Sequence, residues 1–152
     1  MNIFITDPDP RVCAKNLDDK RVIKMILESC QMLSTAMNLS GRVGPYKTTH
    51  ANHPCSIWAR TSRENYMWLL QHMQFLCMEY KHTYEKTHKC ANYLHDLFNG
   101  RWAIPDGLLT PFANCTPYKN MDTIEAYKLT MNRKWLEDKR SPTWKKRSKP
   151  IW

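Results

Sequence analysis

The sequence predicts an all-α fold, a single compact helical domain that spans residues 1–152, and three observations lead to this prediction. The length of 152 residues is that of one domain. Apolar residues make up 42% of the chain and include six tryptophans, which is enough to build a core. Apolar side chains recur at helical spacing in most segments, and only Asn2 to Thr6 alternates as a strand or an extended arm would. We therefore expect a long central helix, irregular loops and a basic C-terminal tail.

The first third of the chain carries clear helix boundaries. Asp9 is expected to cap a short helix that has Pro10 at its first position. Asp18 or Asp19 then caps a long helix, which ends by Gly41. These signals predict two helices in close succession.

The remaining chain is expected to alternate between loops and helices. A loop is expected over residues 41–54, followed by a helical tract from Cys55 to about Lys86, which the Thr61-x-x-Glu64 box could restart. A further helix is expected from His88 to Phe98, before Asn99-Gly100. A proline-containing ordered loop then leads to a last helix, which the Asp122-x-x-Glu125 box opens and which runs to about Trp135.

The polar side chains of the long helix fall on one stripe about 100° wide. This stripe consists of Lys20, Arg21, Lys24, Glu28, Gln31 and Thr35. The rest of the circumference is apolar or small, so we expect protein on most sides of the helix and a cleft over the stripe. Three cations around one carboxylate suggest a site for an anionic polymer, with Glu28 as the acid–base group. The alternative is a simple ion pair between Glu28 and Lys24, four residues earlier.

Net charge points to nucleic acid as the partner. Lys and Arg number 23 against 14 Asp and Glu, which gives +9 and a pI near 9.3. No apolar run has the length of a membrane span, and no signal peptide is recognisable. We expect a soluble, cytoplasmic protein (in the host cell if phage-encoded) that binds duplex DNA, with no membrane contact and no obligatory protein partner evident.

The tail is the main electrostatic candidate. It carries the run Trp144, Lys145, Lys146 and Arg147. Cations neutralise phosphates, and a tryptophan stacks on a base or wedges into a duplex. The alternative is a tail whose tryptophans only dock it on the core.

A second group of candidates surrounds the start of the second helical tract. His53 stands where a loop enters a helix, so it is either a cap or a contact to phosphate or sugar, and Arg60 and Arg63 could extend a phosphate-binding rim. The six cysteines contain no CxxC and are expected to be free thiols. A zinc site from His50, His53 and Cys55 is a rival interpretation, but the spacing fits no standard zinc motif. We expect no metal and no cofactor.

Five motifs carry a resemblance to a known family. They are Met1 to Phe4, Asp19 to Glu28, Thr49 to Cys55, Thr110 to Ala113, and Trp144 to Arg147. With them the chain resembles the phage pyrimidine-dimer DNA glycosylases, also called endonuclease V of the dimer-cleaving type. It is still more similar to uncharacterised phage proteins that are grouped with that family. The resemblance covers nearly the whole chain.

The resemblance implies a mechanism. In that family the N-terminal α-amine attacks the sugar C1′ and forms an imine, a glutamate on the long helix assists, and basic and aromatic groups kink the duplex. Glu28 takes the glutamate's place, with Arg21 and Lys24 near the phosphates or sugar. One departure is Asn2, which is too large for efficient removal of Met1, so the amine of Met1 becomes the candidate nucleophile.

The function expected from all of this is a DNA glycosylase, with or without abasic-site lyase activity, that acts on a damaged or modified pyrimidine in duplex DNA. Three alternatives stay open. The chain could be a non-catalytic nucleic-acid-binding phage protein, an inhibitor of a host factor whose basic face meets an acidic protein, or a zinc-dependent hydrolase.

Overall fold

The computed structural model describes residues 1–152 and is entirely helical, with no strand. The α-helices are α1 (Pro10–Asn16), α2 (Asp19–Leu39), α3 (Pro54–Thr61), α4 (Arg63–Tyr84), α5 (Leu94–Gly100) and α6 (Thr123–Glu137). Two short 3₁₀ helices, η1 (Lys89–Tyr93) and η2 (Arg101–Ala103), flank α5. The prediction of an all-α fold is therefore confirmed. None of these helices has the length and apolarity needed to cross a membrane.

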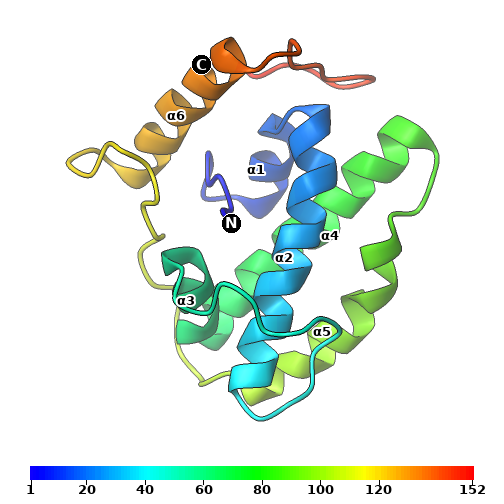
Figure 1. Ribbon diagram of the computed structural model, residues 1–152, viewed down its shortest axis with the longest axis vertical. Helices are drawn as coiled ribbons and strands as arrows, with labels where there is room; N and C mark the ends of the chain where they lie inside the picture. Colours follow the sequence, from blue (N-terminus) through cyan, green and yellow to red (C-terminus); the bar gives the residue numbers. More distant parts are fainter.

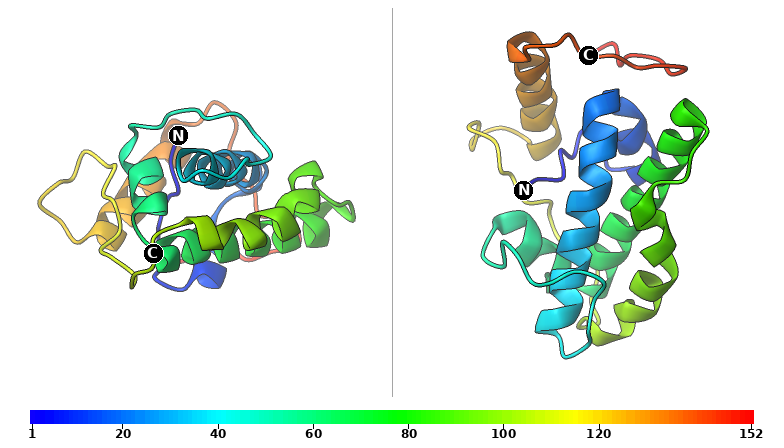
Figure 2. Two further views of the ribbon diagram at one scale, coloured as in Figure 1. Left: turned by 90° about the horizontal axis from the view of Figure 1, so that it is seen from below. Right: turned by 45° about the vertical axis from the view of Figure 1, so that its right-hand side comes forward.

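The two longest helices, α2 and α4, run side by side in opposite directions (Figure 1). Helix α1 packs on α4, and α3 packs on both long helices. Helix α6 stands apart from the long pair at one end of the molecule, and the N-terminal arm lies between α6 and α2 (Figures 1 and 2). This arrangement brings the first residue of the chain beside the middle of α2.

The helix boundaries follow local sequence signals. The Asp9 side chain accepts a hydrogen bond from the Arg11 N–H with Pro10 at the first helical position, as predicted. The Asp122 side chain caps α6 in the same way. Two boundaries were predicted wrongly. Ser62 and not Thr61 caps α4, and its hydroxyl accepts the Asn65 N–H. The single helix expected from His88 to Phe98 is the 3₁₀ helix η1 followed by α5, which extends to Gly100.

Helix α2 is largely enclosed by protein, as its composition predicted. Met25, Ile26 and Cys30 belong to the core, but Ile23 and Leu27 are 39% and 38% exposed. The helix therefore has a second open edge that is apolar, beside its polar stripe. Of these two open edges of α2, only the polar stripe carries side chains able to do acid–base chemistry.

A buried histidine in α4 gives the fold a pH dependence. His72 is fully buried, stacks on Trp68 and hydrogen-bonds the Pro10 carbonyl through Nδ1, while its Nε2 has no partner. Burial lowers the pKa of His72 from 6.5 to about 4. Since the unfolded chain binds a proton below pH 6.5 and the folded chain only below about 4, the free energy of unfolding decreases as the pH falls through this window.

We expect the loss of stability attributable to His72 to approach about 3 kcal/mol at pH 4, because one pKa unit corresponds to about 1.4 kcal/mol. The substitution His72→Phe keeps the ring stacked on Trp68 and removes the titrating group. Urea unfolding between pH 4 and 7 should show a shallower pH dependence for this variant than for the parent. Parallel curves would rule out His72 as the cause.

Candidate active site

The first six residues form an extended arm through the interior of the molecule. Ile3, Phe4 and Ile5 are buried, and the Asn2 side chain accepts hydrogen bonds from the N–H groups of Ile3 (2.7 Å) and Phe4 (3.1 Å). Phe4 has φ +59°, a left-handed conformation that is strained for a bulky residue. The local turn at Asn2 and the bend at Phe4 together fix where the chain end lies.

The amine of Met1 meets the carboxylate of Glu28. The Met1 nitrogen is 3.2 Å from Glu28 Oε1. The Met1 side chain is only 2% exposed although the residue as a whole is half-buried, so its exposed surface belongs mainly to the main-chain end that carries the amine. Glu28 Oε2 is buried and has no hydrogen-bond partner. Glu28 thus pairs with the chain end rather than with Lys24, and one of its oxygens remains available.

His53 is the third member of this group. It is the N-cap of α3, where its Nδ1 accepts the Cys55 N–H at 3.1 Å. Burial lowers the pKa of His53, the positive charge of the Met1 amine lowers it further, and Glu28 opposes this shift. The imidazole of His53 is thus near enough to the Met1 amine and to the Glu28 carboxylate for their charges to act on its pKa.

The loop between α2 and α3 is responsible for the position of His53. It runs back along α2, where the Thr35 hydroxyl donates to the Thr49 carbonyl and accepts the Thr49 N–H. Gly44 lies so close to α2 that a Cβ there would be 2.7 Å from the Ser34 Cα, so no larger residue fits. The loop therefore closes over the side of α2 on which Glu28 lies.

A cavity of about 420 Å³ adjoins the arm. It is lined by Asn2, Cys115, Pro117, Tyr118, Thr130, Arg133, Lys134 and Glu137. Asn2 connects this cavity to the amine of the preceding residue. The site therefore comprises the Met1 amine, a carboxylate with one unpartnered oxygen, a neighbouring imidazole and an adjoining cavity.

Comparison with known protein families agrees with this geometry. The sequence profile of the family described as pyrimidine dimer DNA glycosylase matches residues 1–92. The chain belongs to this family. The match includes the arm, Glu28 and His53, which are the parts that form the amine site. No curated protein sequence and no solved structure matches the chain.

Family membership indicates DNA glycosylase activity and a DNA substrate at the level of the family. The position of each residue predicted to contact DNA comes from the structure of the chain. Lys20 and Lys24 are exposed on α2 and are free to meet phosphates. Arg21 is different, because it is buried between Asp18 (3.1 Å) and Asp138 (2.8 Å). Its charge is compensated inside the protein, so we assign it a structural role and leave it out of the proposed site.

Arg60 and Arg63 brace loops of the protein. Arg60 donates to the Ala51 carbonyl at 2.7 Å and so supports the loop that ends at His53. Arg63 donates to the carbonyls of Arg101 and Ile104 and lies over the Trp102 ring. Arg60 thus acts on the site through the loop, whereas Arg63 secures the segment after α5.

The C-terminal tail is docked on the start of α2. The Asp19 carboxylate accepts hydrogen bonds from the Thr143 hydroxyl, the Lys145 N–H and the Arg147 guanidinium. Burial raises the pKa of Asp19, but these three hydrogen bonds outweigh it and leave the pKa below its ordinary value. Trp144 packs edge-on against Trp135. Trp144 and Arg147, which were expected at the DNA, thus serve at least to anchor the tail.

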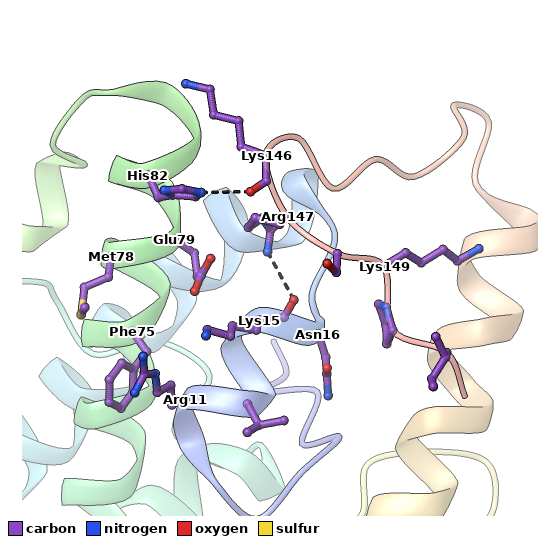
Figure 3. Close-up of a pocket in the computed structure, with 14 residues that line it drawn as sticks. Arg11, Lys15, Asn16, Phe75, Met78, Glu79, His82, Lys146, Arg147 and Lys149 are labelled. Atoms are coloured by element: carbon purple, nitrogen blue, oxygen red, sulfur yellow. Dashed lines mark hydrogen bonds between the residues drawn. The ribbon is translucent and has the colours of Figure 1, made fainter.

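The docked tail borders a basic cavity of about 590 Å³ between α1 and α4 (Figure 3). Its cations are Arg11, Lys15, Lys146, Arg147 and Lys149, against one acid, Glu79. The side chains of Lys146 and Lys149 extend in different directions from the tail (Figure 3). Both residues are exposed, as is Lys145. Lys146 forms an exposed ion pair with Glu85, whose Oε1 lies 3.4 Å from the lysine Nζ. Lys145 and Lys149 are therefore the tail lysines without an acidic partner, whereas the Arg147 guanidinium is bound to Asp19.

We expect the exposed tail lysines to set the salt dependence of DNA binding. Changing Lys145, Lys146 and Lys149 together to Gln should lower the slope of log K against log salt by about 0.9 for each phosphate that the tail no longer neutralises. The matched Lys→Arg triple variant keeps the charges and should keep the slope. Truncation of the tail is a poorer test, because it would also remove the partners of Asp19. A Gln triple variant with the parent's slope would show that the tail does not bind phosphates.

Two residues of the site were not singled out in the sequence. Asn2 was considered only as an obstacle to Met1 removal, yet its side chain shapes the turn behind the amine. Cys115 lies in the loop before α6 with its sulfur 3.3 Å from that of Cys55, 60 residues earlier. The turn at Asn2 has a local signal, since Asn commonly bonds the backbone two residues on. The approach of the two cysteines has none.

Proposed function

We propose that this protein is a pyrimidine-dimer DNA glycosylase with abasic-site lyase activity, in which the Met1 α-amine is the nucleophile and Glu28 the acid–base group. The observation that carries the proposal is the pairing of the Met1 nitrogen with Glu28 Oε1 at 3.2 Å while Oε2 has no partner. An ion pair that only stabilised the fold would not need a buried, unpartnered oxygen, because such an atom costs free energy.

The chemistry follows from these two groups. The unprotonated amine forms a bond to C1′ of the target nucleotide, and the C1′–N1 glycosidic bond breaks with its electron pair leaving on the base. Glu28 accepts a proton from the attacking amine and returns one to the sugar oxygen as the ring opens, which leaves an imine between Met1 and C1′. Glu28, again a carboxylate, accepts a C2′ proton, and the C3′–O bond breaks with its electron pair leaving on the 3′ phosphate, which cuts the strand.

The surroundings suit this reaction. The buried Met1 side chain and the Asn2 turn hold the amine in place, so little positional freedom is lost when the substrate arrives. The cavity beside Asn2 offers room for an extruded base, which a base-releasing enzyme must take out of the stack. Lys20 and Lys24, exposed on the same helix as Glu28, supply charge for the phosphates on either side.

The direct test uses end-labelled duplexes that carry one cyclobutane pyrimidine dimer, one uracil, one hydroxymethylated pyrimidine or no lesion. Base release is measured as alkali-labile sites, and strand cleavage is measured without alkali. We expect release and cleavage only at the dimer. Base release at another pyrimidine would show that the substrate is that base and not the dimer. Tight DNA binding without any base release would contradict the proposed activity.

A further inference from the structure

Three groups that bind soft metal ions converge beside the active site. They are His53 at the cap of α3, Cys55 in its first turn, and Cys115 in the loop before α6. One ligand atom from each lies within 4.8 Å of the other two. Cys55 is buried and the other two are half-buried. The sequence suggested a set with His50, but His50 is exposed and its Nδ1 is hydrogen-bonded to Thr49, and Cys115 takes its place.

We propose that His53, Cys55 and Cys115 form a zinc-binding site with three protein ligands and a fourth position open to solvent. Imidazole and thiolate ligands favour Zn²⁺ over hard ions such as Mg²⁺. Zinc bonds of about 2.3 Å to sulfur and about 2.0 Å to nitrogen require sulfur atoms about 3.8 Å apart in a tetrahedral site. The sulfurs of Cys55 and Cys115 are 3.3 Å apart, so only a small side-chain rotation separates the present arrangement from this geometry.

The imidazole of His53 is already turned toward the cluster. Its Nδ1 accepts the Cys55 N–H at 3.1 Å, so this nitrogen carries a lone pair and no proton. The same lone pair is the one that a zinc ion needs. Zinc at Nδ1 would therefore replace the hydrogen bond by which His53 caps α3.

The loop that carries Cys115 is held in place independently of any ion. The Tyr127 hydroxyl of α6 accepts the Cys115 N–H at 3.2 Å and donates to the Ala113 carbonyl at 3.0 Å. Lys119 donates to the Asn114 carbonyl at 2.6 Å within the same loop. A ligand on a braced loop loses less conformational freedom on metal binding than one on a mobile segment.

The zinc site would connect α3 with the loop before α6, next to the N-terminal arm. Cys55 Sγ is 3.9 Å from the Asn2 side-chain oxygen, and Asn2 and Cys115 line the same cavity. Two thiolates and one Zn²⁺ sum to zero charge, so the ion would tie the loop to α3 without adding net charge next to the Met1 amine. Metal binding here does not depend on the proposed glycosylase reaction.

The chain contains a second thiol group that serves as a control. Cys30, Cys77 and Cys90 are all buried in the core. Unlike the proposed site, this group includes no histidine and belongs to no cluster of possible metal ligands. Cys77→Ser therefore removes a thiol of similar burial without touching the zinc site.

The test titrates the full chain with Co²⁺ and then Zn²⁺ in the absence of DNA, after reduction with a phosphine and removal of metals. We expect one Co²⁺ per chain with a thiolate-to-cobalt charge-transfer absorption that Zn²⁺ abolishes, and one zinc per chain by elemental analysis. Cys115→Ser should weaken binding by roughly 100-fold or more. His53→Asn keeps a cap acceptor and should weaken it as well, whereas Cys77→Ser should bind as the parent does.

Absence of the thiolate absorption in a protein whose six cysteines all react with an alkylating agent after denaturation, and are therefore all reduced, would overturn the proposal. A signal that survives Cys115→Ser but disappears with Cys77→Ser would overturn it too, since the metal would then be in the core. Because neither readout involves DNA, failure here is distinguishable from failure of the base-release assay.

Discussion

Glu28→Gln should lower the rate of base release by ~10²–10⁴-fold, the range that a general acid–base group contributes. Glutamine has nearly the same volume and can still accept a hydrogen bond from the Met1 nitrogen, which lies 3.2 Å from Oε1. It cannot take up the proton that the amine releases as it attacks. The change therefore acts on the chemical step more than on DNA binding. Single-turnover kinetics with saturating enzyme measures this step directly.

A matched control separates the carboxylate's chemistry from its charge. Glu125→Gln removes one negative charge from the surface of α6, where Glu125 pairs with Lys128 at 3.0 Å. Both variants should bind DNA alike, and only Glu28→Gln should lose activity. A variant at position 28 that loses thermal stability but keeps its rate per folded molecule would identify the Met1–Glu28 contact as structural.

Blocking the N-terminal amine should abolish covalent trapping altogether. Borohydride reduces an imine to a stable amine, so the unmodified protein is expected to yield a protein–DNA adduct that peptide mapping places on Met1. Acetylation removes the nucleophilic electron pair. One added residue displaces the amine by up to about 3.6 Å, more than its whole separation from Glu28 Oε1. Intact mass measured beforehand establishes that Met1 is present.

The lysines of α2 are the competing nucleophiles, and conservative variants test them. Lys20→Arg and Lys24→Arg keep the positive charge but remove the primary amine. Both variants should form the trapped protein–DNA adduct as efficiently as the parent does, because the amine paired with Glu28 is that of Met1 and not of either lysine. An adduct mapped to Lys24, or trapping that survives acetylation of Met1 and is lost in Lys24→Arg, would move the nucleophile onto the helix.

The parts of the fold that sequence predicted are those with local causes. Asp9 with Pro10 and Asp122 mark helix starts through hydrogen bonds that span two or three residues, so the signal lies in one short window. Helix α2 was recognisable because its apolar residues repeat over 21 positions. Glu28 could be selected for the same reason, as a carboxylate on the polar stripe of a helix that is otherwise largely enclosed.

The parts that sequence did not predict depend on distant partners. Arg21 lies on the same stripe as Glu28, yet Asp138, 117 residues later, binds it and removes it from the site. The left-handed bend at Phe4 has no sequence signal, because the conformation is unfavourable for phenylalanine and is imposed by the packed arm. The encounter of Cys55 with Cys115 likewise required the tertiary fold.

The docking of the tail on Asp19 has a consequence for the order in which the protein is made. The ribosome releases Asp19 early, but the groups that bind its carboxylate come from Thr143, Lys145 and Arg147. While synthesis continues, the first turn of α2 keeps an unpaired acid that only the helix dipole stabilises. Groups that lie 124 to 128 residues later in the chain thus close the first turn of the helix that carries Glu28. A nascent chain from which Arg147 has not yet emerged lacks this closure, so the first turn of α2 acquires its full set of hydrogen bonds only after residue 147 has left the ribosome.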